Sequence, residues 1–344
     1  MLSYIFKRLL LMVPTLLGAL TITFIVIQFV PGGPIEQLMA ESHVSQKGEG
    51  GAYKAGRDSD AKQIAELKKL YGFDKPAHVR YALMIGNFLR FDLGTSFLRN
   101  KPVWELIKEK LPVSISLGVW TFVLSYLISI PLGIAKAVRE GSRFDALTSM
   151  LVLTGYAIPG FVLGVLLIVL FAGGTFYEWF PLRGLVSDNW SELAWPARIA
   201  DYFWHLTLPL VCLVIGSFAI VTILTKNTFV EEMRKQYVLV ARARGLSQQR
   251  VLYKHIFRNA LIPLVTGFPA AFVGAFFAGS VLIETLFSLD GLGLLAYESV
   301  VRRDYPVVLG SLYLFTLIGL VVKLVSDLLY VLVDPRVQFS SVAR

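Results

Sequence analysis

Long apolar runs alternate with polar stretches along this chain. The runs lie near residues 9–30, 113–135, 147–172, 206–225, 261–283 and 308–331. Each is close to the roughly 20 residues that a helix needs to cross the hydrocarbon core of a bilayer. The pattern therefore predicts an all-α integral membrane protein with six transmembrane helices.

The first run follows Lys7 and Arg8, as the apolar part of a signal peptide does. It is too long for such a segment, however, and Pro31-Gly32-Gly33-Pro34 is no small-residue cleavage site. We therefore predict an uncleaved first transmembrane helix within a segment 1–30.

A long polar region, 31–112, separates the first two spans and is predicted to be a helical extracytoplasmic insertion. Its part from 41 to 60 is rich in Gly, Ser, Lys and Glu. We expect one helix from Asp60 to Gly72 and another from Pro76 through Phe91. The segment Asp92-Leu93-Gly94-Thr95-Ser96 then predicts a turn.

The distribution of basic residues predicts the orientation. Short loops on the side of the termini carry Lys136, Arg139 and Arg143, and then eight Lys or Arg from Lys226 to Arg258. The short loops on the opposite side carry two basic residues each. Because cytoplasmic loops are enriched in Lys and Arg, we expect both termini in the cytoplasm.

Composition agrees with a membrane protein and narrows the chemistry. The chain has 344 residues, of which 55% are hydrophobic and 17% charged, against about 25% charged in an average soluble domain. The net charge of +9 is dispersed among loops, which argues against a nucleic-acid surface and favours lipid headgroups and acidic partners. The single Cys212 excludes an internal disulfide framework, and the four His residues lack metal-ligand spacing, so no metal site is expected.

The basic stretch 231–263 is the most informative segment. Gly245 divides it and suits a helix end with positive φ. Before it, one side of a short helix is expected to carry Tyr237, Val240, Ala241 and Arg244. After it, Ser247 is expected to cap a second, amphipathic helix at the membrane surface. That helix would have a basic stripe (Arg250, Lys254, Arg258) and an apolar face (Leu252, Tyr253, Ile256, Phe257).

Two features inside the apolar runs leave alternatives open. Lys323 and Asp327, one helical turn apart in the last run, are expected to pair, with a proton relay as the alternative. The run 261–283 is rich in small residues, among them Gly267, Gly274 and Ala278. These either permit close packing within the subunit or form the wall of a translocation path or a seam with a partner.

The stretch 231–263 resembles the cytoplasmic coupling loop, or EAA loop, of ABC importer permeases, in its peptide-transporter version. The matching positions are Tyr237, the run Ala241-Arg242-Ala243-Arg244-Gly245 and the run Arg258 to Pro263. Leu239-Val240-Ala241 stands where the general motif has Glu-Ala-Ala, a difference that peptide permeases commonly share. The resemblance implies that Tyr237 and residues 241–245 couple this chain to an ATPase subunit.

Further strings resemble one branch, the Yej-type permeases for oligopeptides and microcin C. They include residues 155–159, 180–187, 201–209 and 287–295, and Asp334-Pro335-Arg336 resembles the tail of peptide permeases. The resemblance implies the type I ABC importer permease fold, with a core at 113–331 that includes the coupling loop 226–260, and a cytoplasmic tail at 332–344. It also implies a bacterial inner-membrane location and the following partners: a second homologous permease, two ATPase subunits that bind ATP and Mg, a periplasmic peptide-binding protein and a peptide substrate.

No catalytic residues are expected in this chain, nor a cofactor of its own. It contains no G-x-x-x-x-G-K-[ST] phosphate-binding loop and no nucleophile elbow or H-E-x-x-H motif. The nearest alternative is a dipeptide or nickel permease of the same superfamily. An ion-coupled secondary transporter would predict paired acids at mid-membrane and inverted repeats, and neither is seen. For a membrane-anchored enzyme or sensor, 31–112 has too few apolar residues to form an independent core.

Overall fold

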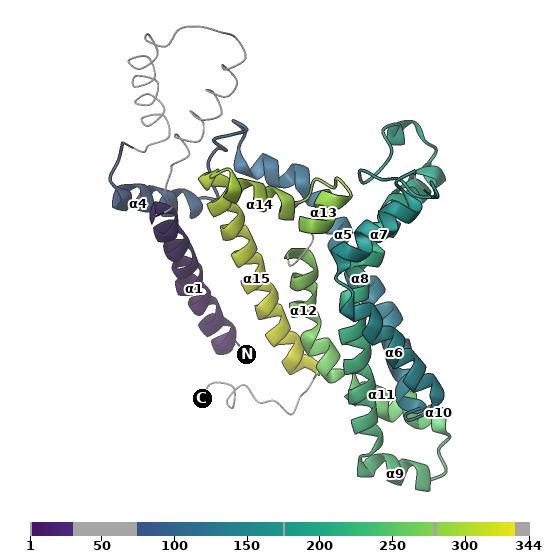
Figure 1. The fold of residues 1–344 in the computed structure, drawn as a ribbon. Helices are drawn as coiled ribbons and strands as arrows, with labels where there is room; N and C mark the ends of the chain where they lie inside the picture. Colours follow the sequence, from purple (N-terminus) through teal and green to yellow (C-terminus); the bar gives the residue numbers. More distant parts are fainter. Residues whose placement is uncertain (1, 30–73, 175, 278–280, 334–344) are drawn as a thin grey trace. The chain divides into compact units, whose positions relative to one another are not determined.

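The computed structural model describes residues 2–29, 74–174, 176–277 and 281–333, and the regular elements of this part are helices. Figure 1 shows them along the chain. The longer ones are α1 (Leu2–Phe29), α4 (Ala77–Phe88), α5 (Val103–Val138), α6 (Arg143–Ala157), α7 (Gly160–Phe171), α8 (Trp195–Met233), α12 (Ile262–Phe277), α14 (Leu292–Val301) and α15 (Tyr305–Val333). The shorter ones are a 3₁₀ turn (Trp190–Glu192), α9 (Gln236–Ala243), α10 (Gln248–Arg250), a π-helical turn (Val251–Ile256), α11 (Phe257–Ala260) and α13 (Val281–Leu286).

Four helices of the described residues are long and apolar enough to cross a membrane. They are Ile5–Phe29 of α1, the whole of α5 and α8, and Tyr305–Leu328 of α15. Two bent pairs pass the same test: α6 with α7, bent by 91°, and 248–260 with 262–274, bent by 48°. If each bent pair is one span, the described residues hold six, which is the predicted number.

The bend between α6 and α7 was not predicted. It lies at Pro159, which precedes the first residue of α7. Proline lacks an N–H donor and disfavours the helical conformation at the residue before it. Ile158 is accordingly extended, with φ −83° and ψ 118°. The predicted span at 147–172 therefore consists of two helices.

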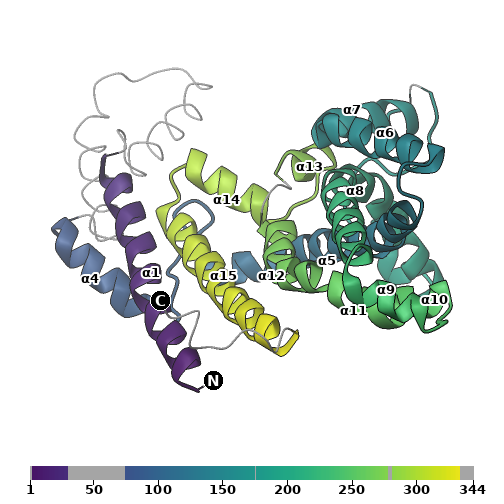
Figure 2. The same cartoon turned by 90° about the horizontal axis from the view of Figure 1, so that it is seen from below.

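The helices fall into two compact units. The first unit holds residues 112–294 and the segment from 321 onward. Within it, α8 contacts α6, α7, α11, α12 and α13, and Figure 2 shows α7 and α13 beside α8. Two hydrophobic clusters of its described residues include parts of α8, one around Leu206 and Leu210 and the other around Phe229, near the last turn.

The second unit holds residues 2–111 and 295–320. Here the predicted helix after Pro76 is confirmed as α4, which is shorter than expected and ends at Phe88. The predicted turn is also present: the Gly94 N–H donates to Asp92 Oδ1 at 3.0 Å, and Gly94 has φ +78°. Asp304 anchors this turn, because its buried carboxylate accepts from the Ser96 hydroxyl at 2.5 Å and the Phe97 N–H at 3.0 Å.

Several predictions lie outside the described residues. These are the helix from Asp60 to Gly72, the insertion from 31 to 73, Ala278 and the tail from residue 334. They stay predictions.

Candidate coupling site

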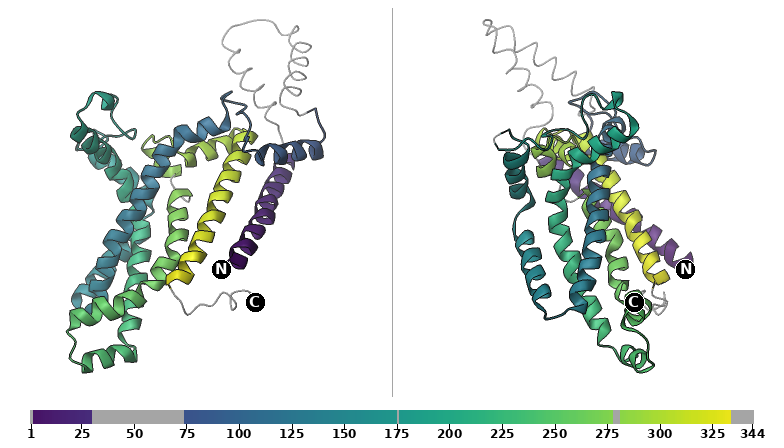
Figure 3. Two further views of the ribbon diagram at one scale, coloured as in Figure 1. Left: turned by 180° about the vertical axis from the view of Figure 1, so that it is seen from behind. Right: turned by 90° about the vertical axis from the view of Figure 1, so that its right-hand side faces the viewer.

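The predicted short helix before Gly245 is α9, which lies at the end of α8 (Figure 3). Its inward side carries Val238 and Ala241, which are buried, and Tyr237, which is half-buried. Val240 and Arg244, which were expected on the same side of this helix as Tyr237 and Ala241, are exposed. The side chains that pack inward, at 237, 238 and 241, follow the i, i+1, i+4 spacing of one helical stripe.

Tyr237 joins three segments of the loop. Its hydroxyl donates to Glu232 Oε2 at 2.7 Å, and its ring packs on the cluster around Phe229. Burial raises the pKa of the Tyr237 phenol, and a hydrogen bond with the Asn259 side chain opposes that shift. Glu232 also accepts a hydrogen bond from Lys235, which raises the pKa of Lys235. Tyr237 thereby connects the end of α8 with α9 and α11.

The turn at Gly245 matches its prediction. Gly245 has φ +76°, and its N–H donates to the Arg242 carbonyl at 2.9 Å. The Leu246 N–H reaches back to the Ala241 carbonyl at 3.4 Å, so the last turn of α9 is closed by a six-to-one bond of the Schellman type. Ser247 occupies the N-cap position of α10, but its side chain makes no capping bond, so the predicted cap is wrong in that respect.

The second helix of the loop is irregular. It runs through α10, the π-helical turn and α11 before the chain enters α12 at Ile262. Val251 and Ile256 are buried, whereas Tyr253, which was expected on the apolar face, is 62% exposed. The buried positions are five residues apart because the π-helical turn has i to i+5 bonding. The predicted basic stripe of Arg250, Lys254 and Arg258 is exposed.

The buried side chains of the loop pack into one hydrophobic cluster, which we call the loop cluster. It combines the ends of α5 and α8 with the buried side chains of the loop: Ile134, Ala137, Phe229, Val238, Ala241, Val251, Ile256 and Ala260. The described residues of the chain leave the opposite surface of α9 uncovered. Leu239 is 60% and Val240 51% exposed, and Arg242, Ala243 and Arg244 are also exposed. The loop therefore presents a mixed apolar and basic surface on a packed support.

A buried charge cluster lies on the same side of the unit as the loop cluster. Asp145, in the first turn of α6, accepts from Lys226 of α8 at 2.8 and 2.6 Å. Its Oδ1 also lies 3.2 Å from the ammonium of Lys136 on α5. The side chains of Lys136 and Asp145 are only 1% and 8% exposed, and that of Lys226 is 21% exposed. We call these three residues the Asp145 cluster.

The remaining polar groups of this cluster are also satisfied. The Lys136 ammonium donates to the Asp145 carbonyl, the Thr148 hydroxyl and the Ser149 hydroxyl, at 3.0, 2.9 and 2.7 Å. The Gly141 N–H donates to Asp145 Oδ2 at 3.2 Å, and the Ser142 hydroxyl accepts from the Asp145 N–H at 3.3 Å. A buried ion pair is tolerated when its charges are hydrogen-bonded in this way. The cluster thus connects α5, α6 and α8.

Near the Asp145 cluster, α5 and α8 pack closely against each other at Gly133. A Cβ at Gly133 would lie 2.5 Å from Thr225 Cβ and 2.9 Å from the Thr222 carbonyl oxygen. Only glycine fits there without displacing α8. The two helices that carry Lys136 and Lys226 are therefore in direct contact within one turn of those lysines.

Comparison with known proteins now identifies the family. Residues 129–339 match the model of the binding-protein-dependent transport system inner membrane component. The chain belongs to this family. The permease is 54% identical to the peptidoglycan transport system permease protein YejB of Agrobacterium fabrum, over 98% of each chain. It is 51% identical to the inner membrane ABC transporter permease protein YejB of Escherichia coli O157:H7, over 98% of this chain and 99% of that one.

The fold has a solved counterpart. A chain of the MetNI methionine ABC transporter, in its inward-facing conformation, aligns with a TM-score of 0.50 and 15% identity, covering 67% of the permease and 97% of that chain. The all-α membrane fold expected from the sequence is confirmed. The family also makes this chain the inner-membrane transport component of a system that includes a binding protein, and not its catalytic component.

The other predicted site residues lie on α15 and α12 of the permease. Lys323 is exposed and Asp327 is half-buried on α15, one turn apart, and their pairing stays a prediction. Gly267 is exposed and Gly274 half-buried on α12, and a Cβ on either would meet no atom of the described residues within 4 Å. Whether these glycines permit packing within the subunit or form the wall of a translocation path stays a prediction. Among the described residues, no three His, Cys, Asp or Glu side chains are grouped to hold a metal ion.

Reasoning from the sequence missed the Asp145 cluster. It counted Lys136 as a loop cation, whereas Lys136 is a buried residue of α5. Two local signals were present. Lys136 stands alone in the run Gly133-Ile134-Ala135-Lys136-Ala137-Val138, and Ser142-Arg143-Phe144-Asp145 has the S-x-x-[DE] spacing of a helix start. The link to Lys226, 81 residues further on, has no local signal.

Proposed function

We propose that the permease forms, with a second homologous permease, the translocation path of an ATP-driven importer of oligopeptides. The two YejB relatives described above are named as permeases of transport systems, one of them for peptidoglycan. This supports a cargo of oligopeptides and peptide conjugates, including peptides released from peptidoglycan and compounds such as microcin C. ATP and Mg are bound by two ATPase subunits, and a periplasmic binding protein delivers the peptide.

The observation that carries the coupling role is the surface of α9 that stays exposed among the described residues, on the opposite side of the helix from the loop cluster. Leu239, Val240 and Ala243 offer apolar contact area, and Arg242 and Arg244 flank it with charge. Tyr237 and Ala241 face inward and hold α9 in place, so their part in coupling is to position the helix. Gly245 sets the angle at which α9 leaves the second helix. An interface with a central apolar contact and surrounding charge is typical of specific protein partners.

The Asp145 cluster extends this coupling into the membrane part. The loop cluster fastens α9 to the ends of α5 and α8, and the Asp145 cluster fastens the start of α6 to the same two helices. A displacement of α9 by the ATPase subunit would thus carry α5, α6 and α8 with it as one body. Rigid-body movement of this kind is a common way for a nucleotide state to switch a transport path. In this arrangement both termini and the coupling loop lie in the cytoplasm.

Transport by the reconstituted complex tests this function. Proteoliposomes that contain the permease, its homologous partner and the ATPase subunits should accumulate an oligopeptide when the binding protein and ATP are present. Accumulation should stop when ATP is replaced by a non-hydrolysable analogue. Uptake driven by an ion gradient without ATP would contradict the proposal and favour an ion-coupled transporter. Uptake of dipeptides or nickel in preference to longer peptides would contradict the assigned cargo.

A further inference from the structure

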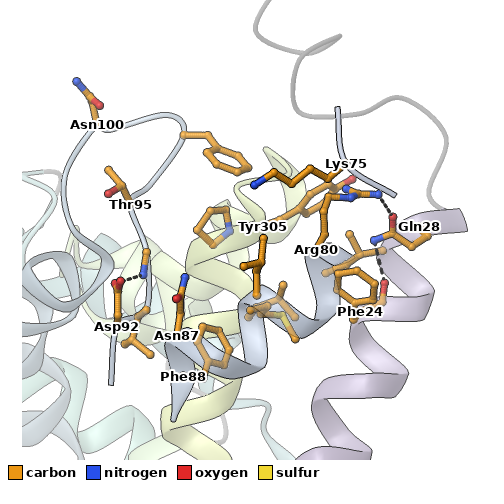
Figure 4. A pocket seen from close by; sticks show the side chains of 18 residues that line it. Phe24, Gln28, Lys75, Arg80, Asn87, Phe88, Asp92, Thr95, Asn100 and Tyr305 are labelled. Atoms are coloured by element: carbon orange, nitrogen blue, oxygen red, sulfur yellow. Dashed lines mark hydrogen bonds between the residues drawn. The ribbon is translucent and has the colours of Figure 1, made fainter. Parts of the chain in front are cut away.

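The described residues of the two units pack in different ways. Those of the second unit line a cavity of about 580 Å³, with walls from α1, α4, the turn after α4 and the start of α15 (Figure 4). In the first unit, Figure 3 shows α5 and α8 side by side, and hydroxyl groups of α5 are buried against α8. The contact between these two helices combines hydrogen bonds with close packing.

Two serines of α5, four residues apart, bond to α8. The Ser125 hydroxyl lies 2.6 Å from the Ser217 hydroxyl, and the Ser129 hydroxyl donates to the Phe218 carbonyl at 3.0 Å. Ser125 and Ser129 are 1% and 0% exposed. Because residues four apart lie on one side of a helix, these bonds form a row along α5. A displacement of either helix would leave buried hydroxyls without partners, which is unfavourable in apolar surroundings.

Gly133 continues this row by another four residues and limits how the helices can be shifted. A Cβ at Gly133 would lie 2.5 Å from Thr225 Cβ. A shift of α5 along α8 by one helical turn would bring Ser129 or Ala137 opposite Thr225, and each of these residues has a Cβ. The contact therefore fits one register. We call Ser125, Ser129 and Gly133, with their partners on α8, the polar seam.

The contact between α5 and α8 continues on both sides of the polar seam. On one side are the Asp145 cluster and the loop cluster, which includes Ala137 of α5 and Phe229 of α8. On the other side, the Trp120 indole donates to the Tyr202 hydroxyl at 3.1 Å, and its ring packs edge-on against Phe203. From Trp120 to Ala137, α5 rises by roughly 25 Å. The two helices are thus joined over most of the thickness of a bilayer core.

The first turns of α8 also hold the segment 184–193, which precedes them. The Ser187 N–H and hydroxyl donate to the Asp201 carboxylate at 2.9 and 2.5 Å. The Arg198 guanidinium donates to the Leu193 carbonyl at 2.8 Å, and the Trp190 indole donates to the Arg198 carbonyl at 3.1 Å. We call this segment the far lobe, because it lies at the opposite end of α8 from the coupling loop. A displacement of the start of α8 would therefore displace the far lobe too.

We propose that α5 and α8 form one lever, which keeps the register of the polar seam throughout transport and carries movement of the coupling loop to the far lobe. The proposal rests on the proposed function, in which an ATPase subunit displaces α9, and adds how that displacement crosses the membrane part. Elements with a fixed register move as a rigid body, whereas helices that slide past each other exchange their contacts. Ser125, Ser129 and Gly133 are accordingly positioning residues for transport.

A disulfide bond across the polar seam tests this proposal. The variant Ser125→Cys/Ser217→Cys is made together with Cys212→Ala, which removes the native thiol, and is reconstituted with the homologous permease, the ATPase subunits and the binding protein. Because the two hydroxyl oxygens lie 2.6 Å apart, sulfur atoms in their place lie near the disulfide length of about 2.05 Å. Oxidation with copper phenanthroline forms the bond, and mass spectrometry of the digested permease measures its yield. We expect the oxidised complex to import peptide at the rate of the reduced complex.

Loss of uptake on oxidation, with recovery after dithiothreitol, would overturn the lever, because it would show that α5 and α8 must slide. The proposed function would survive that result, since the reduced complex would still import peptide with ATP. Failure of the two cysteines to join would overturn the register of the polar seam. The Cys212→Ala permease without the new cysteines is the control, and its uptake should not respond to the oxidant.

A pair of glycine variants tests the polar seam without a cross-link. Gly133→Ala places a methyl group against Thr225, whereas Gly216→Ala adds the same group to α8 where no atom of the described residues lies within 4 Å. We expect Gly133→Ala to bind the ATPase subunit normally but to reduce the peptide imported per ATP hydrolysed at least about threefold, because it separates the two helices. Gly216→Ala should import as the wild type does. Equal import per ATP by the two variants would contradict the proposal.

Discussion

At the scale of single residues, Asp145 is important for stability because its carboxylate pairs with the ammonium groups of both Lys136 and Lys226. Replacing it in Asp145→Asn leaves Lys136 and Lys226 close together without an anion. Removing one partner of a buried ion pair costs about 3–5 kcal/mol. We therefore expect Asp145→Asn to lower the thermal unfolding midpoint of the purified permease and its level in the membrane.

Two further variants serve as references for the unfolding temperature of Asp145→Asn. Lys226→Met keeps the Asp145–Lys136 pair and should have a smaller effect. Glu140→Gln breaks the ion pair with Arg234, whose side chain is 72% exposed, and exposed pairs contribute only about 0–1 kcal/mol. If Asp145→Asn unfolds at the same temperature as Glu140→Gln, the Asp145 cluster does not stabilise the permease.

At the scale of elements, the coupling loop depends on the left-handed turn at Gly245. A Cβ there would meet no atom of the described residues within 4 Å, so the strain of a substitution comes from its φ of +76°. That conformation costs a residue with a side chain about 1–2 kcal/mol, and a β-branched residue more. Gly245→Val should therefore leave membrane insertion intact but weaken binding of the ATPase subunit about tenfold, measured by titrating purified ATPase onto the immobilised permease complex.

Gly245→Asn is the matched control for this turn. Asparagine enters the left-handed region more readily than other residues with a side chain, so this variant should bind the ATPase subunit more tightly than Gly245→Val. Equal binding by both variants would mean that the conformation at 245 does not orient α9.

The loop was also the element that the sequence predicted best. The positive φ at Gly245 and the exposed basic stripe follow from local propensities, which one segment carries by itself. The π-helical turn and the bend at Pro159 were missed. A π-helical turn changes the bonding register without any distinctive residue type, so the expected apolar face was displaced and Tyr253 was assigned to the wrong side.

At the scale of the whole molecule, the orientation in the membrane stays a prediction with a direct test. Reporter fusions at Gly141 and Arg250 should report a cytoplasmic location, and a fusion at Asp188 should report the opposite side. The physical reason is the concentration of Lys and Arg around 136–143 and 226–258. A cytoplasmic signal at Asp188 would contradict the six-span arrangement.

The sequence indicated the class of fold because apolar length alone defines a membrane span. It did not indicate which helices touch, since contacts between distant segments leave no local pattern. The sequence pointed to the small residues of α12 as a packing surface. The tightest helix contact described above is instead that of Gly133 with α8, and Gly133 is a single glycine in an ordinary apolar run. The Asp145 cluster illustrates the same point, because Lys226 is 81 residues away from its partner.

The central claim is that the exposed surface of α9 docks on an ATPase subunit, and one measurement tests it most directly. The permease complex is purified with wild-type α9 and with Arg242→Glu, and the ATPase subunit that co-purifies is quantified against the membrane level of the permease. Arg242 is exposed and outside the loop cluster, so the reversal of charge should leave folding intact. We predict normal permease levels with co-purified ATPase reduced at least about fivefold, since a reversed charge at an interface costs of the order of 1 kcal/mol or more. Normal amounts of ATPase on the Arg242→Glu permease, with normal peptide uptake, would contradict the account and leave the loop as a solvated connection between helices.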